Sequence, residues 1–266
     1  MLEPLYTPSN CKPAFQLRWS LALFPYAELP SPDSWIDGLK RGTEGDGVRV
    51  LEYRRRASDV WQFLVSTQPN VAPPQVIKSV KGRLQNLVRH THPKAFRRNF
   101  SLSSLGDANR ASVEQYVSDQ LGHHRMADAR IQARLARYQL AFPDADLSQP
   151  VFSDHGRYVY NLHLVFVLSE RSSDVSVEFL DATRDMVLKV ARKKGHELSH
   201  LAILADHLHM TLKAPYECSP QEIALSYLNN LAYAHGLRPV YQYGYFVGTF
   251  GEYDMNAVRR SGTSAG

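Results

Sequence analysis

Residues 206–212 read Asp-His-Leu-His-Met-Thr-Leu, and this stretch decides how the chain is interpreted. Polar and apolar side chains alternate along it, which predicts a β-strand. Residues two positions apart in a strand point to the same face of a sheet, so His207 and His209 can bind one metal ion together. The stretch therefore predicts a strand that offers two imidazoles to a metal.

A second stretch, residues 116–120, reads Tyr-Val-Ser-Asp-Gln. An i, i+4 spacing in a helix places Tyr116 and Gln120 on one face. The hydroxyl of a tyrosine can act as a nucleophile, which is the group that the histidine stretch lacks. Neither stretch forms a catalytic site alone, and together they predict a metal site beside a nucleophile.

Both stretches belong to an internal repeat, which predicts two similar units in one chain. The strand-like residues 15–23 resemble residues 160–168, and each run opens a segment with the same order of elements. In each segment a later strand-like run precedes a helix that starts at a proline, either Pro74 or Pro220. Proline suits a first helical turn, so these boundaries have a physical basis.

The repeat pairs each reactive residue with a counterpart of different chemistry. The pairs are His207 with Val60, His209 with Gln62, Tyr116 with Ser261 and Gln120 with Ala265. The first unit has therefore lost both imidazoles, and the second has lost the tyrosine. Random decay would more often remove parts from the same copy or from both, whereas here one full set survives. This complementarity predicts a single composite site.

The 266 residues divide into two units and a connector. Residues 1–125 are expected to form one unit and residues 157–266 the other, with residues 126–156, rich in helix-forming side chains, as a helical connector. Each unit mixes strands with helices. This pattern predicts an α+β fold made of two antiparallel sheets with helices packed on one face of each.

The composition of the chain bears on its cellular location. Apolar runs fall short of the roughly 20 residues needed to cross a bilayer, and the start of the chain lacks a secretory pattern. Only two cysteines, Cys11 and Cys218, are present, too few for a disulfide framework or a cysteine metal site. We therefore expect a cytoplasmic protein that does not contact membranes.

The formal net charge of +5 is unevenly distributed. Residues 1–125 carry 17 Lys and Arg against 11 Asp and Glu, whereas residues 157–266 carry 11 of each kind. An excess of positive charge favours binding to nucleic-acid phosphates, although a solvated basic surface gives the same pattern. The candidate DNA contacts in the first unit are Arg54, Arg55, Arg56, Lys81, Arg83, Arg97 and Arg98.

These motifs resemble those of the IS200/IS605-type transposases, single-tyrosine members of the histidine-hydrophobe-histidine (HUH) nucleases. The resemblance covers nearly all of both units, through residues 206–209, the proline-started helix that follows them, and residues 113–120. It implies a ferredoxin-like fold in each unit and a dimer whose tyrosine helix can lie against the histidines of the partner. This chain is similar to such a dimer fused end to end, an intramolecular pseudo-dimer that could associate further.

The resemblance also implies a role for each reactive residue. Tyr116 would be the nucleophile. The residues that would hold a divalent ion, Mg²⁺ or Mn²⁺, are His207, His209 and Gln120, although other transition metals suit the same ligands. The implied reaction nicks and joins single-stranded DNA, carrying a hairpin, through a 5′-phosphotyrosine intermediate that leaves a free 3′-OH. One site would remain where the family dimer has two.

Other assignments stay open. Tyr253 is a rival nucleophile, although an alanine stands four residues after it. His123 and His124 either support the metal ligands, contact DNA or form a solvated pair. A phosphoesterase with two His-x-Thr/Ser motifs fits poorly, because only residues 209–211 supply one. A transposase co-opted as a DNA-binding or regulatory protein would keep the basic residues and lose turnover.

Overall fold

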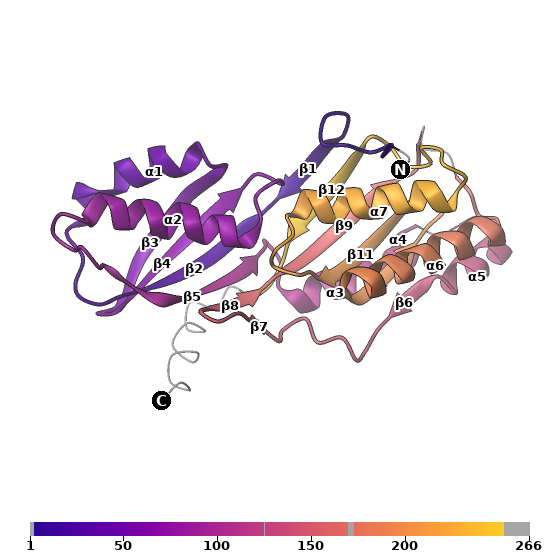
Figure 1. The fold of residues 1–266 in the computed structure, drawn as a ribbon. Helices are drawn as coiled ribbons and strands as arrows, with labels where there is room; N and C mark the ends of the chain where they lie inside the picture. Colours follow the sequence, from indigo (N-terminus) through magenta and orange to yellow (C-terminus); the bar gives the residue numbers. More distant parts are fainter. Residues whose placement is uncertain (1–2, 125, 170–172, 253–266) are drawn as a thin grey trace.

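The computed structural model describes residues 3–124, 126–169 and 173–252. These residues form two six-stranded sheets that lie side by side, each with helices packed against it (Figure 1). The strand order is β3-β4-β2-β5-β8-β7 in the first sheet and β1-β12-β9-β11-β10-β6 in the second. The expectation of a mixed α and β structure is therefore confirmed.

The elements span the described chain from end to end. The strands are β1 Lys12–Gln16, β2 Arg18–Pro25, β3 Val48–Ala57, β4 Val60–Thr67, β5 Phe96–Leu105, β6 Gln139–Ala141, β7 Val151–Phe152, β8 Gly156–Val159, β9 Asn161–Val167, β10 Glu197–Ile203, β11 His207–Lys213 and β12 Gly244–Thr249. The helices are η1 Pro32–Ser34, α1 Ile36–Glu44, α2 Pro73–Val88, α3 Arg110–Ser118, α4 Gln120–His123, α5 Ala129–Ala136, α6 Val177–Lys194 and α7 Pro220–Ala234. No helix in the described part of the chain has the length and apolarity of a transmembrane segment.

The two sheets repeat one order of elements. In the first the order is β2, α1, β3, β4, α2 and β5, and in the second it is β9, α6, β10, β11, α7 and β12. The strands pair in equivalent ways, as β3-β4-β2-β5 and β10-β11-β9-β12. The repeat seen in the sequence is thus also a repeat of connectivity.

The second helix of each unit begins at a proline, at the predicted Pro220 in the second unit and at Pro73, one residue before the predicted Pro74, in the first. In α7 the N-cap Ser219 and Glu222 form a reciprocal capping box. In α2, which begins at Pro73, Gln75 makes the corresponding side-chain contact to the N-cap backbone. Both helices therefore start with paired N–H groups, and their apolar faces pack into the core over one side of each sheet.

Each unit contributes a strand to the sheet of the other, so neither sheet is purely antiparallel. β1 pairs in parallel with β12, and the chain then crosses at Leu17 into β2 of the first sheet. β8 pairs in parallel with β5, and the chain then crosses at Tyr160 into β9 of the second sheet. The expected antiparallel sheets are corrected to mixed sheets, and boundaries at residues 125 and 157 do not separate them cleanly.

The crossing points are held by two equivalent sets of hydrogen bonds. Ser104 Oγ, at the end of β5, accepts from the backbone N–H of Asn161 at 3.0 Å. Thr249 Oγ1, at the end of β12, accepts from the backbone N–H of Arg18 at 2.8 Å. Each hydroxyl also donates to a backbone carbonyl of the other strand end. The two units are therefore joined through buried, directional contacts.

Two glycines at the same junction leave no room for a side chain. A Cβ at Gly106 would lie 2.6 Å from the carbonyl oxygen of Thr249. A Cβ at Gly251 would collide with the carbonyl of Ser104. The strand ends can approach each other this closely only because both positions lack a Cβ.

The connector and the helices before it bridge the units. Residues 126–156 hold α5, but they also hold β6, which pairs with β10, and β7, which pairs with β8. α3 packs on β10 and β11, on the face of the second sheet opposite to α6 and α7 (Figure 1). Helices therefore cover both faces of the second sheet rather than the one face expected, because a helix from the first unit occupies the other.

Candidate active site

The predicted histidine pair lies on a central strand. β11 turns Leu208 into the core, and the alternation of the strand puts His207 and His209 on the opposite face. Their ring centroids are 5.0 Å apart. His163 on the neighbouring β9 points to the same face, with Nε2 3.0 Å from Nδ1 of His209. Three imidazoles therefore gather where two were predicted.

Each predicted histidine ligand has a partner at Nδ1. His207 Nδ1 lies 2.6 Å from Oδ1 of Asp206, and His209 Nδ1 lies 3.0 Å from Nε2 of His163. If Nδ1 carries the proton and donates it to these partners, the lone pair of each ring is at Nε2. A metal-binding histidine is commonly oriented by such a contact to its other nitrogen. Both contacts thus suit metal binding through Nε2.

Burial keeps two of these imidazoles neutral. It lowers the pKa of His163 to about 4. It is also the largest cause that lowers the pKa of His209 to about 2, and the neighbouring imidazoles add to the effect. A neutral imidazole has a lone pair to give, so at neutral pH His209 is in the form that a metal ligand requires.

Tyr116 reaches this face on α3. The helix begins at Asn109, whose side chain accepts a hydrogen bond from the N–H of Ser112 at 2.8 Å. The Tyr116 ring meets His209 edge to face at 5.8 Å between centroids and is 48% exposed. The tyrosine of the first unit therefore lies beside the histidines of the second and stays open to solvent.

Gln120 lies one turn after Tyr116, at the start of α4. Its side chain is buried; Nε2 donates to the Tyr116 carbonyl at 3.0 Å, and no described residue hydrogen-bonds to the buried Oε1. The backbone carbonyl of Gln120 accepts from the N–H of His124, whose ring lies 5.0 Å from that of His207. A buried amide oxygen without a partner is costly, and a cation would satisfy it.

These donors fit a divalent ion. Two neutral imidazoles and an amide cancel none of the charge of the ion, and they suit Mn²⁺ or Mg²⁺ as well as other transition metals. Among the described residues no group of three or more His, Cys, Asp or Glu side chains could hold a metal ion. Gln120 Oε1 is a neutral oxygen donor to which no described residue hydrogen-bonds.

Sequence reasoning missed His163 and undervalued its neighbours. His163 is the one histidine in the apolar run 160–168, and the repeat places that run in the centre of a sheet. A lone histidine in such a run could have marked His163 as a site residue. His123 lies 6.3 Å from the Tyr116 ring, between centroids, and His124 lies beside His207. Neither is remote from the site. Tyr253, Ser261 and Ala265 lie outside the described residues.

The arginines of β3 alternate between the two faces of the first sheet. Arg54 and Arg56 lie on the face of Gln62, and Arg56 Nε donates to the Gln62 side chain at 2.9 Å. Arg55 points to the other face and pairs with Glu28. These three predicted DNA contacts therefore do not act as one cluster.

The remaining predicted DNA contacts lie elsewhere on the first unit. Arg83 forms a two-pronged ion pair with Asp46, with distances of 2.6 and 2.7 Å. Lys81 donates to the backbone carbonyl of Arg98 at 2.7 Å. Arg97 lies 4.0 Å from the carboxylate of Asp59. Arg83 and Lys81 are thus already engaged within the protein, which reduces what each can offer to a phosphate.

Comparison with known proteins gives a family for the second unit. Residues 157–260 match the family described as "Transposase IS200 like". The expected resemblance to these transposases is therefore confirmed for the second unit, while the first unit lies outside the matched residues. No curated protein matches the chain.

Solved structures resemble the chain only distantly. One is a REP-associated tyrosine transposase bound to a REP hairpin, with 16% identity and a TM-score of 0.31; the match covers 38% of this chain and 61% of that one. Another is a putative glycine cleavage system transcriptional repressor, with 9% identity and a TM-score of 0.24; that match covers 89% of this chain and 98% of the other.

Proposed function

We propose that this protein, whose residues 157–260 match the IS200-like transposase family, is a metal-dependent transposase for single-stranded DNA. It nicks and joins DNA at one composite site, to which both units contribute. The observation that carries this proposal is the position of Tyr116, on a helix of the first unit, 5.8 Å from His209 of the second between ring centroids.

The ligand set follows from the partners of each donor. His207 and His209 would bind the ion through Nε2, because Asp206 and His163 engage their Nδ1 atoms. Gln120 would add its free Oε1. A divalent ion in this site would polarise the phosphate and stabilise the charge that develops on its oxygens. The resemblance implies Mg²⁺ or Mn²⁺.

Tyr116 supplies the covalent step. Its phenolic oxygen, after losing its proton, attacks the phosphorus of a phosphodiester, and the bond from phosphorus to the 3′ oxygen breaks. The departing 3′ oxygen takes up a proton and becomes a free 3′-OH, while the 5′ phosphate stays on the tyrosine. Attack of a 3′-OH on the phosphotyrosine reverses these bonds and joins a strand. Exposure of the ring gives the DNA access to it.

The architecture supports a fused dimer of ferredoxin-like units. Each unit has the β-α-β-β-α-β order and the same strand pairing, which are the features of that fold. The tyrosine helix of one unit lies on the sheet of the other. The substrate that the resemblance implies is single-stranded DNA with a hairpin.

A covalent-adduct assay tests the proposal. Full-length protein is incubated with Mn²⁺ and a hairpin oligonucleotide library labelled at the 3′ end, because a 5′-phosphotyrosine keeps the 3′ fragment on the protein. We expect a labelled protein band on a denaturing gel, lost in Tyr116→Phe and in EDTA, and kept in the control Tyr233→Phe. Tyr233 is an exposed tyrosine on α7. A band that persists in Tyr116→Phe would refute the nucleophile assignment.

The same assay separates an enzyme from a co-opted DNA-binding protein, which would bind the oligonucleotides and give no adduct. Mixing Tyr116→Phe with His207→Ala asks whether the site forms within one chain. We expect no recovery of the adduct, because the junction at Ser104 and Thr249 holds both halves of the site in a single chain. Recovered activity would show that the parts come from different chains.

A further inference from the structure

The first sheet carries a polar row at the place that corresponds to the histidine site. The register across its strands pairs Arg54 with Gln62, Gln62 with Ala22, Ala22 with Ser101 and Ser101 with Arg157. In the second sheet His209 is paired with Ala202 and Val165 in the same way. Gln62 thus occupies the position of His209, and both ends of its row are arginines.

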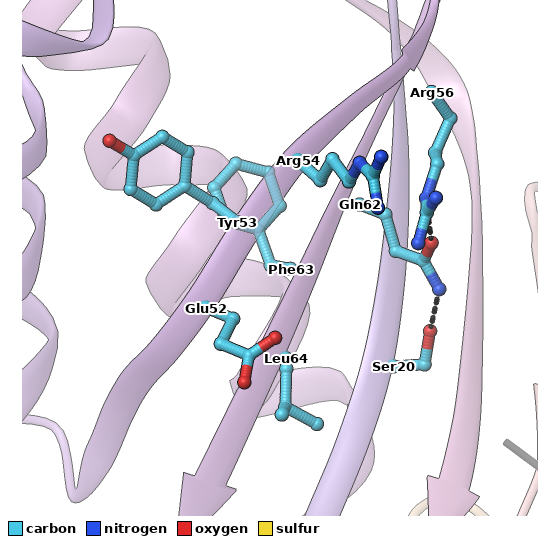
Figure 2. Close-up of a pocket in the computed structure, with 8 residues that line it drawn as sticks. All are labelled: Ser20, Glu52, Tyr53, Arg54, Arg56, Gln62, Phe63 and Leu64. Carbon is cyan, nitrogen blue, oxygen red and sulfur yellow. Dashed lines mark hydrogen bonds between the residues drawn. The ribbon is translucent and has the colours of Figure 1, made fainter. Parts of the chain in front are cut away.

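The amide of Gln62 is fixed by its neighbours. It accepts from Arg56 Nε at 2.9 Å and donates to Ser20 Oγ at 2.6 Å, and Figure 2 shows this chain of contacts beside the side chain of Arg54. Ser20 is two residues before Ala22 on β2, just as His163 is two residues before Val165 on β9. An arginine-bound amide therefore replaces the pair of imidazoles.

The cations of this row are not neutralised. Within the described residues no carboxylate lies within ion-pair distance of Arg54, Arg56 or Arg157, and the buried Nη2 of Arg56 has no hydrogen-bond partner there. Among the described residues the contacts of Arg157 Nη1 are long, at 3.4 and 3.5 Å to two serine hydroxyls. Guanidinium N–H groups left in this state require an acceptor.

A hollow of about 330 Å³ opens at the Arg54 end of the row. Arg54, Arg56, Gln62 and Ser20 line it together with one carboxylate, Glu52 (Figure 2). Figure 2 shows the side chain of Glu52 apart from those of Ser20 and Arg56, so an anion would be held on the side of the arginines. Two cations against one anion leave the hollow positively charged.

We propose that this row binds the backbone of single-stranded DNA without a metal ion, in the unit that has lost its histidines. Guanidinium forks match phosphate oxygens, and the buried side chains of Gln62 and Ser101 between the arginines carry no opposing charge. Four strand spacings of about 4.8 Å separate Arg54 from Arg157, so the row extends over about 19 Å and can contact more than one phosphate. The proposal rests on the proposed function, since it assigns the second contact of the same substrate.

Equilibrium binding tests the proposal without catalysis. Full-length protein in EDTA is titrated against a labelled single-stranded oligonucleotide at several salt concentrations, and fluorescence anisotropy gives the affinity. Each phosphate contact to a single strand contributes about 0.7 to the slope of log affinity against log salt. The double variant Arg54→Gln, Arg157→Gln is therefore expected to flatten the slope by about 1.4 and to weaken binding at low salt.

The matched control is Arg55→Gln, next to Arg54 on β3 but on the opposite face and paired with Glu28. We expect its slope to change by less than about 0.5, below the value of one contact. Gln62→Glu is a second test, because a carboxylate there would neutralise Arg56 and weaken binding. An unchanged slope in a folded double variant would overturn the proposal, as would an equal loss in the control.

The adduct assay keeps this result separate from the proposed function. The adduct is scored on wild-type protein, because it depends on Tyr116 of α3 and His209 of β11, which form the site on the second sheet. If wild-type protein forms no adduct, the proposed enzymatic function is refuted. The salt dependence of binding still tests whether the row of Arg54 and Arg157 contacts DNA. A duplex of the same sequence that shows the same change in slope would overturn the assignment to a single strand.

Discussion

His163 offers the sharpest test of how the metal would be held. If His209 binds through Nε2, its proton is on Nδ1, and the acceptor 3.0 Å away is Nε2 of His163. His163→Leu removes that acceptor and leaves a buried N–H unpaired. His163→Gln can present an amide oxygen in its place. The two variants differ mainly in whether the His209 proton has a partner.

The expected magnitude follows from the cost of the unpaired donor. A buried N–H without a partner costs about 1–3 kcal/mol, which is roughly a 5- to 150-fold change in an equilibrium constant. His209 is buried, so water cannot replace the lost partner easily. We therefore expect His163→Leu to weaken Mn²⁺ binding by about 10- to 100-fold, as is common for residues that orient a ligand. His163→Gln should stay within about 3-fold of wild type, well below that cost.

Calorimetric titration of Mn²⁺ into each full-length variant measures these affinities, with circular dichroism to check folding. His235→Leu is the control, because it removes a partly buried histidine that stacks on Phe179, away from the site. The reasoning is refuted if His163→Leu binds Mn²⁺ like wild type. It is equally refuted if His163→Gln loses as much affinity as His163→Leu, because a hydrogen-bond acceptor for His209 Nδ1 would then not explain the affinity for Mn²⁺.

Two further predictions concern the fold. Thr249→Val keeps the shape of the side chain but leaves the Arg18 N–H without its acceptor, and Ser104→Ala removes the acceptor of the Asn161 N–H. Each variant should lose about 2 kcal/mol of stability and lower Tm by roughly 4–8 °C. A thermal melt with the wild-type Tm would contradict a stabilising role for these hydrogen bonds. His196, whose pKa is lowered to about 4, chiefly by burial and further by Lys194, is paired with Tyr227. Because the unfolded chain binds that proton more readily, stability should fall as pH drops from 6.5 to 4 by up to about 3 kcal/mol. His196→Gln should lack this part of the loss in urea titrations, and an identical pH profile in the variant would exclude it.

Local patterns predicted the elements well because the forces that form them are local. The alternation in residues 206–212 gives β11, and prolines begin α2 and α7, at Pro220 as predicted and at Pro73 beside the predicted Pro74. The exchange of β1 and β8 was not predicted, because no local pattern says which distant edge a short strand will join. Residues 12–16 have no periodicity that distinguishes β12 from a strand of their own unit. The exchanged strands are followed by the long-range hydrogen bonds of Thr249 to Arg18 and of Ser104 to Asn161, which no local pattern announces.

The candidate site also combines features that local sequence patterns predict with features that depend on long-range packing. Spacing in the sequence put His207 beside His209 and Tyr116 beside Gln120, and the complementary losses in the repeat predicted that the two pairs share one site, but neither shows the packing that brings them together. That packing includes Val117 against Ala202, which lie far apart in the chain. His163 escaped notice because its role comes from the register between β9 and β11 and not from any motif.

The loss of histidines in the first unit left an ordered arrangement in their place. Gln62 is held by Arg56 and Ser20, so the position that cannot bind a metal is tied to a cation that can bind a phosphate. A site divided between two units works only while the units keep their relative position. The hydrogen bonds of Ser104 and Thr249 would therefore serve catalysis as well as folding, because they fix the sheet that carries the histidines to the unit that carries Tyr116.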